Sequence, residues 1–442
     1  MKILWIVNIT MPDTCEKIGM NKPVVGGWLT GYQDALLSRW HQELELHIIE
    51  PASIGTPQEV ITQHKQFGNN IFHHLFPSQW LQSASAFSAK PHSQLTPLSN
   101  QLAALFIQIN ESVQPDVVHI HGTEYPHSLV WIEACGATNV LVSIQGLTSV
   151  YARYYMAGLT PHEQCPTLHD IRYHVSLAKG QALFEHRGEA EKRLLAKVNH
   201  VAGRTAWDHS HAKAINPDIQ YHTLQEVLRT EFYDQEKHWA LSSCNRHTIF
   251  VSQSHYPIKG LHKLLEAMPL ILSQYPDTRL RIVGEDPTQK QWWQMSTYGK
   301  ALKQRIEKPC NSSASMRKHI EYLGQLSAQQ MADEYQKAHL FVCPSAIENS
   351  SNSVCEAQMI GTPVVASYVG GLMDLICHGK TGLLYRFEET EMLAQAVCQI
   401  FSDDEYAQML SEQSREAAKI RHDRLCIADT LYNIYKEIAH GC

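Results

Sequence analysis

Short apolar runs alternate with amphipathic segments along most of this chain. Runs such as 3–7, 117–120 and 248–252 are rich in Ile, Leu and Val and end in polar or glycine-containing turns, which is typical of buried strands. Between such runs, segments like 28–40 and 261–275 carry apolar residues at helical spacing. This alternation predicts a parallel α/β architecture.

The alternation stops once near the middle of the chain and then starts afresh. The segment 233–246 is polar and has no strand character, so we interpret it as an interdomain linker. We predict one α/β domain over 1–238, a second over 239–424, and a final helix with an apolar stripe over 425–442. A chain of 442 residues is long enough for two domains, and doubly wound sheets bind ligands beyond the carboxyl ends of their strands.

Composition narrows the class of protein. Hydrophobic residues make up 44% of the chain and charged residues 18%, as in a folded protein. The net charge of −7 argues against a nucleic-acid partner. The eleven cysteines and 26 histidines are dispersed without the spacing of a metal site, so we expect reduced thiols and no bound metal.

Nothing in the sequence predicts a membrane-spanning helix, because no apolar run reaches the required length of roughly 18 to 20 residues. The apolar start of the chain reads as a first strand rather than a signal peptide. We therefore expect a cytoplasmic protein. The basic residues Arg415, Lys419, Arg421 and Arg424 predict a solvated helix, and peripheral contact with an anionic membrane at its inner face stays open.

The sharpest chemical feature is the segment from Glu348 to Glu356, which lies between the strand-like runs 339–343 and 363–367. Small polar residues open a helical stretch here, so backbone N–H groups from Ser350 to Val354 are expected at a helix start. Unpaired N–H groups and the helix dipole favour a bound diphosphate. The two flanking carboxylates suit the paired hydroxyls of a sugar or ribose.

This segment resembles the family 4 retaining glycosyltransferases, whose fold, GT-B, consists of two tandem Rossmann-like domains with a cleft between them. Glu348 and Glu356 match the E-x7-E motif of that family, and GTPVVASYVGG at 361–371 matches the segment after it. The resemblance implies that Glu356 holds the nucleotide ribose and that Glu348 lies beside the transferred sugar. The alternative interpretation is one solvated loop glutamate and one helix-surface glutamate.

A second match lies at VSQSHYPIKGLHKLLEAM, residues 251–268. The family grips the donor diphosphate here with a Lys-Gly pair, which corresponds to Lys259 and Gly260, and a mobile lysine charge would stabilise the departing diphosphate. Gln253 stands where the family has an arginine. This departure leaves charge neutralisation to Lys259 and the helix start. The alternative is an ordinary exposed lysine.

In the first half, HIHGTEYP places His119 and His121 at the end of a predicted strand. By resemblance His121 faces the donor sugar near the reaction centre, whereas His119 is interpreted as a packed core histidine. The pair Gly26 and Gly27 resembles the glycines that let backbone approach the diphosphate and acceptor, with a flexible loop hinge as the alternative.

The blocks SIQGLTSVYARYY, GRTAWD and EVLRTEFY, which begin at 143, 203 and 226, resemble a bacterial subgroup that acts in surface-polysaccharide assembly. Gln145 and Arg204 could line the acceptor side or serve equally as structural hydrogen-bonding residues. The resemblance places the base pocket near Gly324 and Gln325. It also implies that the final helix packs back on the first domain.

The resemblance therefore implies a first, acceptor-side domain and a second, donor-binding domain. The catalytic candidates are Glu348, Lys259 and His121. The predicted donor contacts are Gly27, Gln253, Lys259, Gly324, Gln325, Asn349, Ser350, Ser351, Asn352, Ser353, Val354 and Glu356.

The predicted reaction is transfer of a hexose-type sugar from a nucleoside diphosphate sugar to a hydroxyl of a saccharide or lipid-linked saccharide, with retained anomeric configuration. No carboxylate is placed as a covalent nucleophile, and no metal or resident cofactor is implied. A UDP-sugar is slightly favoured over a GDP-sugar. The alternatives are a sugar-nucleotide 2-epimerase and a non-catalytic sugar-nucleotide-binding module. An NAD oxidoreductase ranks below both because G-x-G-x-x-G is missing.

Overall fold

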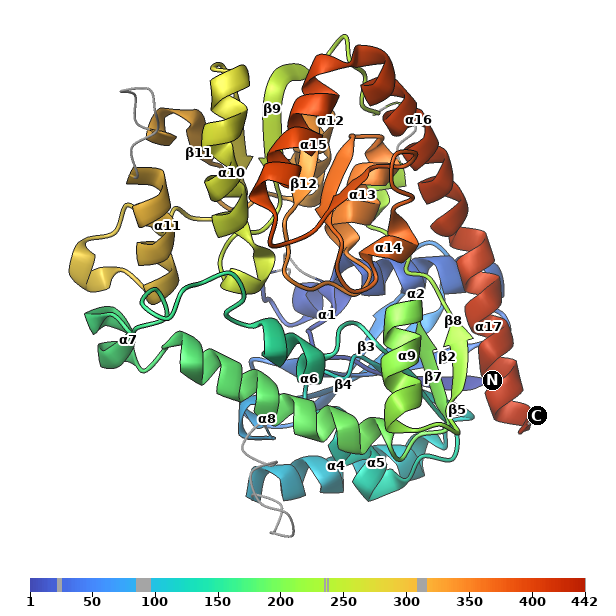
Figure 1. The fold of residues 1–442 in the computed structure, drawn as a ribbon. Helices are drawn as coiled ribbons and strands as arrows, with labels where there is room; N and C mark the ends of the chain where they lie inside the picture. The colour runs from blue at the N-terminus through green and yellow to red at the C-terminus, as the bar shows by residue number, and fades with distance from the viewer. Residues whose placement is uncertain (22–25, 85–96, 234–235, 237, 308–315, 442) are drawn as a thin grey trace. The chain divides into compact units, whose positions relative to one another are not determined.

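The computed structural model describes residues 1–442 except 22–25, 85–96, 234–235, 237, 308–315 and 442 (Figure 1). The chain divides into two compact units. Unit 1 comprises 1–150, 184–229 and 422–442, and unit 2 comprises 151–183 and 230–421. The described residues of the predicted linker 233–246 all fall in unit 2, and its residues 234, 235 and 237 lie outside the described part of the chain.

Unit 1 is built on a sheet in which the described strands follow the order β3-β4-β2-β1-β5-β6-β7-β8. Only the pairing of β3 with β4 is antiparallel. The hairpin β3–β4 was not among the predicted strands. The bounds are β1 Lys2–Ile6, β2 Glu45–Ala52, β3 Gln58–Gln63, β4 Asn70–Pro77, β5 Val117–His121, β6 Val140–Ser143, β7 His200–Gly203 and β8 Gln220–Thr223.

Helices cover this sheet and close its core. Strand side chains such as Leu4 and Phe76 pack with Phe106 and Trp131 from the helices in one buried hydrophobic cluster, which is the main source of stability for such a layer. The helices are α1 Pro12–Lys17, α2 Gly27–Trp40, α3 Gln79–Ala84, α4 Pro97–Val113, α5 His127–Cys135, the part of α8 (Leu177–Leu195) from residue 184, α9 Ala206–Ile215 and α17 Arg424–His440.

The C-terminal helix α17 belongs to unit 1, which confirms the prediction that it packs back on the first domain. Trp40 of α2 stacks on Tyr432 with ring centroids 4.0 Å apart. The buried indole of Trp5 on β1 donates to the Tyr435 hydroxyl at 2.9 Å. These contacts tie the end of the chain to its first strand and helix.

Unit 2 has an all-parallel sheet with the strand order β11-β10-β9-β12-β13-β14 over the described residues. Helices α10 and α15 pack together, as do α12 and α13. The strands are β9 Asn245–Val251, β10 Arg279–Ile282, β11 Ile320–Tyr322, β12 Ala338–Cys343, β13 Val364–Ser367 and β14 Leu383–Tyr385. The helices are α7 Leu168–Tyr173, α10 Leu261–Gln274, α11 Thr297–Glu307, α12 Ala328–Lys337, α13 Asn352–Ile360, α14 Leu372–Leu375, α15 Thr390–Ser402 and α16 Asp404–Arg421.

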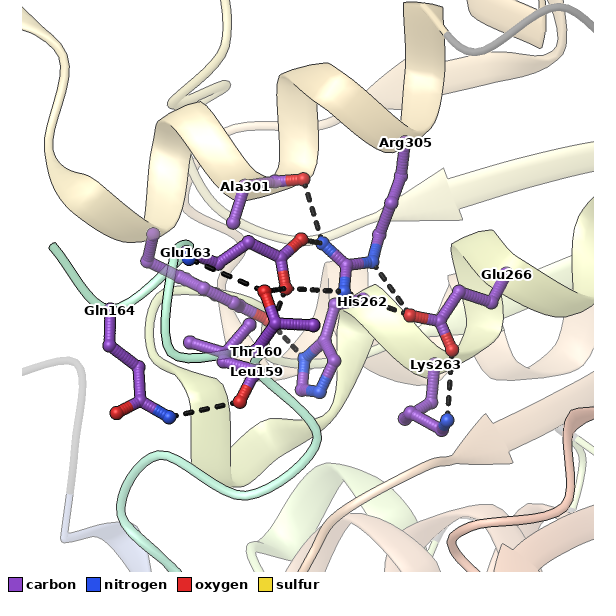
Figure 2. Close-up of polar contacts among 10 residues, drawn as sticks. Leu159, Thr160, Glu163, Gln164, His262, Lys263, Glu266, Ala301 and Arg305 are labelled. Carbon is purple, nitrogen blue, oxygen red and sulfur yellow. Dashed lines mark hydrogen bonds and ion pairs between the residues drawn. The ribbon is translucent and has the colours of Figure 1, made fainter.

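Residues 151–183, which we assigned to the first domain from the sequence, pack with unit 2 instead. An ion-pair network holds this insertion on α10 and α11 (Figure 2). Arg305 pairs with Glu163 of the insertion and with Glu266 of α10, the latter at 2.8 Å. Burial opposes the charge of Arg305, but the two carboxylates outweigh it and raise the pKa of the guanidinium. Because the paired residues are far apart in the sequence, no local sequence pattern indicates these ion pairs.

Among the described helices, none is both long and apolar enough to cross a bilayer.

A substitution of Gly260 measures how much the stability of unit 2 depends on the close approach of Gly260 to Pro344. It has a positive φ of 70°, and a Cβ at this position would lie 1.7 Å from the backbone oxygen of Pro344. We expect Gly260→Ala to lower the free energy of unfolding by at least about 2 kcal/mol, measured by urea denaturation. Gly379→Ala, where φ is 77° and the nearest atom lies 3.7 Å away, should cost only about 1 kcal/mol. Equal losses in the two variants would contradict the importance of this approach.

Candidate functional site

Helix α13 begins at Asn352 with Ser351 as its N-cap, within the stretch from Ser350 to Val354 where a helix start was predicted. The Ser351 side chain makes no capping hydrogen bond, so the first N–H groups of the helix have no partner from that side chain. Glu348 and Glu356 are both only 6% exposed. The alternative interpretation of two solvated glutamates is therefore wrong.

Glu348 is held from several sides. Its Oε1 accepts from the Lys259 ammonium at 2.6 Å and from the Ser345 hydroxyl at 2.8 Å. Its backbone oxygen accepts from Gly371 N–H at 3.0 Å. A Cβ on Gly370, whose φ is 55°, would lie 1.9 Å from that same oxygen. The glycine pair after β13 thus lets the chain pass directly against the Glu348 backbone.

Lys259 ends the short helical turn η4 (Pro257–Lys259) after β9, and its side chain is only 16% exposed. This burial contradicts the alternative of an ordinary exposed lysine. Burial alone would lower the pKa of Lys259. The Glu348 carboxylate opposes this through its charge and hydrogen bond, with Tyr256 and Tyr151 contributing, and the pKa is raised above its usual range. Lys259 therefore remains a cation at any physiological pH.

A small pocket of unit 2 brings predicted donor residues together. Its lining includes Gln253, Lys259, Glu348, Ser351 and Ser353. The room inside is about 20 Å³, which accommodates about one water molecule. The Lys259–Glu348 pair thus lines a pocket that is too small for a diphosphate in this arrangement.

Gly324 and Gln325 lie at the carboxyl end of β11 and are not part of the pocket lining. Gly324 has a φ of 68° and exchanges backbone hydrogen bonds with Gly284 at 2.8 and 3.2 Å. This turn ends two neighbouring strands at the same edge of the sheet. Its position agrees with the predicted base pocket, and contact with a base stays a prediction.

His121 ends β5 in unit 1 and is 2% exposed, with neither ring nitrogen hydrogen-bonded. Burial lowers its pKa to about 3, so the ring is neutral at physiological pH. His119 is fully buried, and its two nitrogens lie 2.7 Å from the Tyr435 and Ser143 hydroxyls. The interpretation of His119 as a packed core histidine is confirmed.

The predicted glycine pair stands at the start of α2. Gly26 is its N-cap with a φ of 84°, and residues 22–25 before it lie outside the described part of the chain. A Cβ on Gly27 would lie 2.8 Å from Cγ of Arg229. Close packing within unit 1 therefore already requires Gly27, and its contact with the donor stays a prediction.

Arg204 and Gln145 lie together in unit 1. The guanidinium of Arg204 lies 2.6 Å from Oε2 of Glu226 and donates to the backbone oxygen of Gln145 at 2.8 Å. Arg204 and Glu226 are 7% and 3% exposed. The pairing favours the structural role that the sequence left open, and a role toward the acceptor stays a prediction.

Sequence reasoning missed Tyr151. It is the first residue of the insertion, and its hydroxyl accepts from the backbone N–H of Asn349 at 2.9 Å. Burial and the nearby Glu348 charge raise the pKa of this phenol, so it stays neutral. The block from 143 to 155 was noted in the sequence, but nothing in it indicated which loop the tyrosine would meet.

Sequence reasoning also missed Glu124, three residues after His121. Its Oε2 atom is buried without a hydrogen-bond partner. Burial raises the pKa of Glu124 to about 7, Glu191 and Glu226 add to this, and its own backbone N–H and Arg204 partly oppose it. Burial, together with carboxylates from distant parts of the chain, distinguishes Glu124 from an ordinary glutamate.

Among the described residues, no group of three His, Cys, Asp or Glu side chains is placed to hold a metal ion.

Glu124 predicts a pH-dependent stability. Its carboxyl holds a proton up to about pH 7 in the folded chain, against an ordinary value of 4.5, so its contribution is present below pH 4.5 and is lost as the pH rises through 7. When the pH is raised from 5 to 8, the free energy of unfolding of the unmodified protein should fall. The fall should be about 1 to 3 kcal/mol smaller in Glu124→Gln. Urea denaturation at both values measures this. The exposed Glu189 on α8 gives the control Glu189→Gln, and equal pH dependence of the two variants would contradict the assignment.

The match to a known protein family lies within unit 2. Residues 235–417 match the family model of glycosyl transferases group 1. A D-inositol 3-phosphate glycosyltransferase of Corynebacterium urealyticum is 28% identical over 41% of this chain and 41% of its own length. A glycogen synthase of Mycobacterium tuberculosis is 26% identical over 44% of this chain and 43% of its own. The chain thus spans less than half the length of these relatives.

Solved structures are similar over the whole chain. A sucrose-phosphate synthase from Thermosynechococcus elongatus has a TM-score of 0.68 at 17% identity, covering 100% of both chains. Anabaena Alr3699/HepE in complex with UDP-glucose has a TM-score of 0.61 at 15% identity, covering 98% of both. These likenesses confirm the predicted fold. Residues 235–417 thus resemble the glycosyl transferases group 1, and the chain has a GT-B fold.

Proposed function

We propose that this protein is a retaining glycosyltransferase that moves a sugar from a nucleoside diphosphate sugar to a hydroxyl acceptor. The observation that carries the proposal is the buried Lys259–Glu348 pair in the pocket that Ser351 and Ser353 also line. A protonated lysine and helix N–H groups attract a diphosphate, and a buried carboxylate beside them accepts from sugar hydroxyls.

The donor divides into three parts with separate partners. The diphosphate lies against Lys259 and the start of α13. Glu356, buried one turn into the same helix, accepts from the ribose hydroxyls. Glu348 and His121 are assigned to the transferred sugar, and Gly324 and Gln325 to the base.

Donor binding requires the Lys259–Glu348 pair to rearrange, since the pocket holds about one water in the present arrangement. The diphosphate brings negative charge that competes with Glu348 for the ammonium. Once Lys259 turns to the phosphate oxygens, Oε1 of Glu348 becomes available to sugar hydroxyls. A single exchange of partners thus brings Lys259 to the diphosphate and makes Glu348 available to the sugar.

In the reaction, the bond from the sugar C1 to the diphosphate oxygen breaks, and the electron pair leaves with the diphosphate. The acceptor oxygen forms a new bond to C1 on the same face, and its proton passes to a phosphate oxygen of the leaving group. Lys259 and the helix start stabilise the developing charge without a metal. Positioning of the acceptor beside C1 supplies the rest of the rate enhancement.

UDP is the favoured nucleotide, since a protein of similar fold, Anabaena Alr3699/HepE, is known with UDP-glucose. We assign the acceptor to saccharides or lipid-linked saccharides, in cell-surface polysaccharide or glycoconjugate synthesis. This assignment rests on the three sequence blocks near 143, 203 and 226. The enzyme acts on the cytoplasmic side.

Thermal denaturation with UDP and with uridine, both in EDTA, tests the division of the donor site. Saturating UDP should stabilise the unmodified protein by about 3 kcal/mol at a concentration 100 times its Kd. Lys259→Ala should lose the preference for UDP over uridine, because it loses the diphosphate contact. Glu356→Gln should weaken both ligands, because both carry the ribose.

The exposed Lys380 supplies the control for that measurement, since Lys380→Ala keeps the pocket intact. Stabilisation by UDP that needed Mg²⁺, or that survived unchanged in Lys259→Ala, would contradict the proposed site.

Product analysis separates transfer from epimerisation. We expect UDP release from a UDP-sugar to depend on an added saccharide acceptor, to persist in EDTA, and to give a glycoside with the donor's anomeric configuration. His121→Ala should lower kcat at least about 100-fold, a size typical of a lost transition-state contact. Appearance of a free epimer without acceptor would instead identify a sugar-nucleotide epimerase.

A further inference from the structure

Unit 2 carries a cluster of large apolar side chains that face solvent. We call it the apolar–basic surface. Its apolar members come from the insertion around α7 and from the turn η5 (Trp292–Gln294) before α11, and they are 48 to 67% exposed. They are Leu168, Ile171, Tyr173, Val175, Trp292 and Trp293. Large apolar side chains gathered in this way mark an interaction site on a protein surface.

The two segments form one continuous surface because they pack against each other. Helix α7 contacts η5, and the two lie side by side in Figure 1. The Thr167 hydroxyl donates to the backbone oxygen of Met295 at 2.8 Å. Thr297 N–H donates to Asp170 Oδ2 at 2.9 Å. These two hydrogen bonds hold the segments together, and the exposed tryptophans lie next to the exposed face of α7.

The charge of this surface is opposite in sign to the net charge of the chain. Residues 165–183 and 287–300 contain four cations, Arg172, Lys179, Lys290 and Lys300, within a chain of net charge −7. All four are exposed. The one carboxylate in these two stretches, Asp170, is 2% exposed and accepts from Thr297 and Thr167. Within these two stretches the accessible charge is therefore positive, and the exposed Glu185 and Glu285 lie just outside them.

The apolar–basic surface is firmly attached to the donor-binding unit. Glu163 of the insertion pairs with Arg305 of α11, which also pairs with Glu266 of α10 (Figure 2). Both partners of the Glu163–Arg305 pair are only 11 to 13% exposed. Such a connection transmits a force on the insertion to the body of unit 2.

We propose that the apolar–basic surface docks unit 2 onto an anionic lipid membrane. Trp292, Trp293 and Tyr173 enter the boundary between headgroups and acyl chains, where amphipathic aromatic rings partition. The four cations meet the phosphates of the headgroups. This combination of exposed aromatic side chains with four exposed cations is complementary to an anionic lipid surface.

Two other surfaces and partners fit less well. A second copy of the chain seated face to face would bring the same cations together, because an isologous interface pairs identical patches. The basic residues of the C-terminal tail are partly engaged, since Lys419 pairs with Glu416 at 2.7 Å and Arg421 donates to Gln358. The apolar–basic surface, in contrast, combines exposed aromatic side chains with exposed cations, and Arg172 lies over the ring of Tyr173.

Co-sedimentation of the full chain with lipid vesicles tests the proposal. We expect binding to phosphatidylcholine vesicles that contain phosphatidylglycerol, weaker binding to phosphatidylcholine alone, and release at high salt. Trp292→Ala combined with Trp293→Ala should reduce binding at least about tenfold. Lys179→Glu combined with Lys290→Glu should abolish the preference for phosphatidylglycerol.

Matched controls come from Leu270→Ala and Met392→Ala, which remove exposed apolar side chains elsewhere on unit 2 and should leave vesicle binding unchanged. Unaltered thermal unfolding of the tryptophan variant shows that its fold is kept. The proposal is overturned if both tryptophan and control variants bind as the unmodified chain does. It is equally overturned if the tryptophan substitutions instead dissociate a dimer in gel filtration.

Discussion

The buried ion pair of Lys259 and Glu348 is the interaction on which the donor-binding unit depends. It joins the turn after β9 to the loop after β12, two strands that are neighbours in the sheet. Two charges with side chains 16% and 8% exposed are stable only if each satisfies the other, because removal of either leaves a buried charge without a partner. The surrounding glycines follow from this. Gly260 and Gly370 have positive φ angles and lie against the backbone of Pro344 and Glu348, so the two loops meet closely enough for the pair to form.

The same pair bears on the proposed donor binding. Buried charges destabilise a protein unless they are paired, and the contact of Lys259 with Glu348 removes that cost. Under the proposed function, a diphosphate would offer the ammonium a partner of higher charge, and sugar hydroxyls would offer donors to the carboxylate. Such an exchange would leave both charges with a partner. Tyr151 supports this arrangement from the insertion, because its hydroxyl receives the Asn349 N–H directly after Glu348 and fixes the loop while the side chains change partners.

Patterns that are local in sequence predicted much of this molecule, and features that depend on distant residues were missed. The strand and helix alternation predicted both sheets, and the segment from Glu348 to Glu356 was correctly placed at a helix start. Lys259 was identified from the resemblance of residues 251–268 to a family segment, and an anion site at this helix start stays a prediction. Tyr151 could not be identified, because its partner lies about 200 residues later in the chain and no local pattern encodes that contact. The carboxyl of Glu124 owes its raised pKa chiefly to burial, and Glu191 and Glu226 from distant segments add to it.

The insertion 151–183 shows why the missed features matter together. Its first residue reaches the loop of Glu348, its middle is held by Arg305, and α7 packs against η5. A continuous two-domain division places this segment with the first domain, since linear order is the only guide that sequence offers. The ion pairs of Figure 2 join this segment to unit 2 instead. As a consequence, the donor pocket and the apolar–basic surface belong to one packed unit. A membrane that binds α7 and η5 would therefore hold the pocket of Lys259 and Glu348 at a fixed depth relative to the lipid.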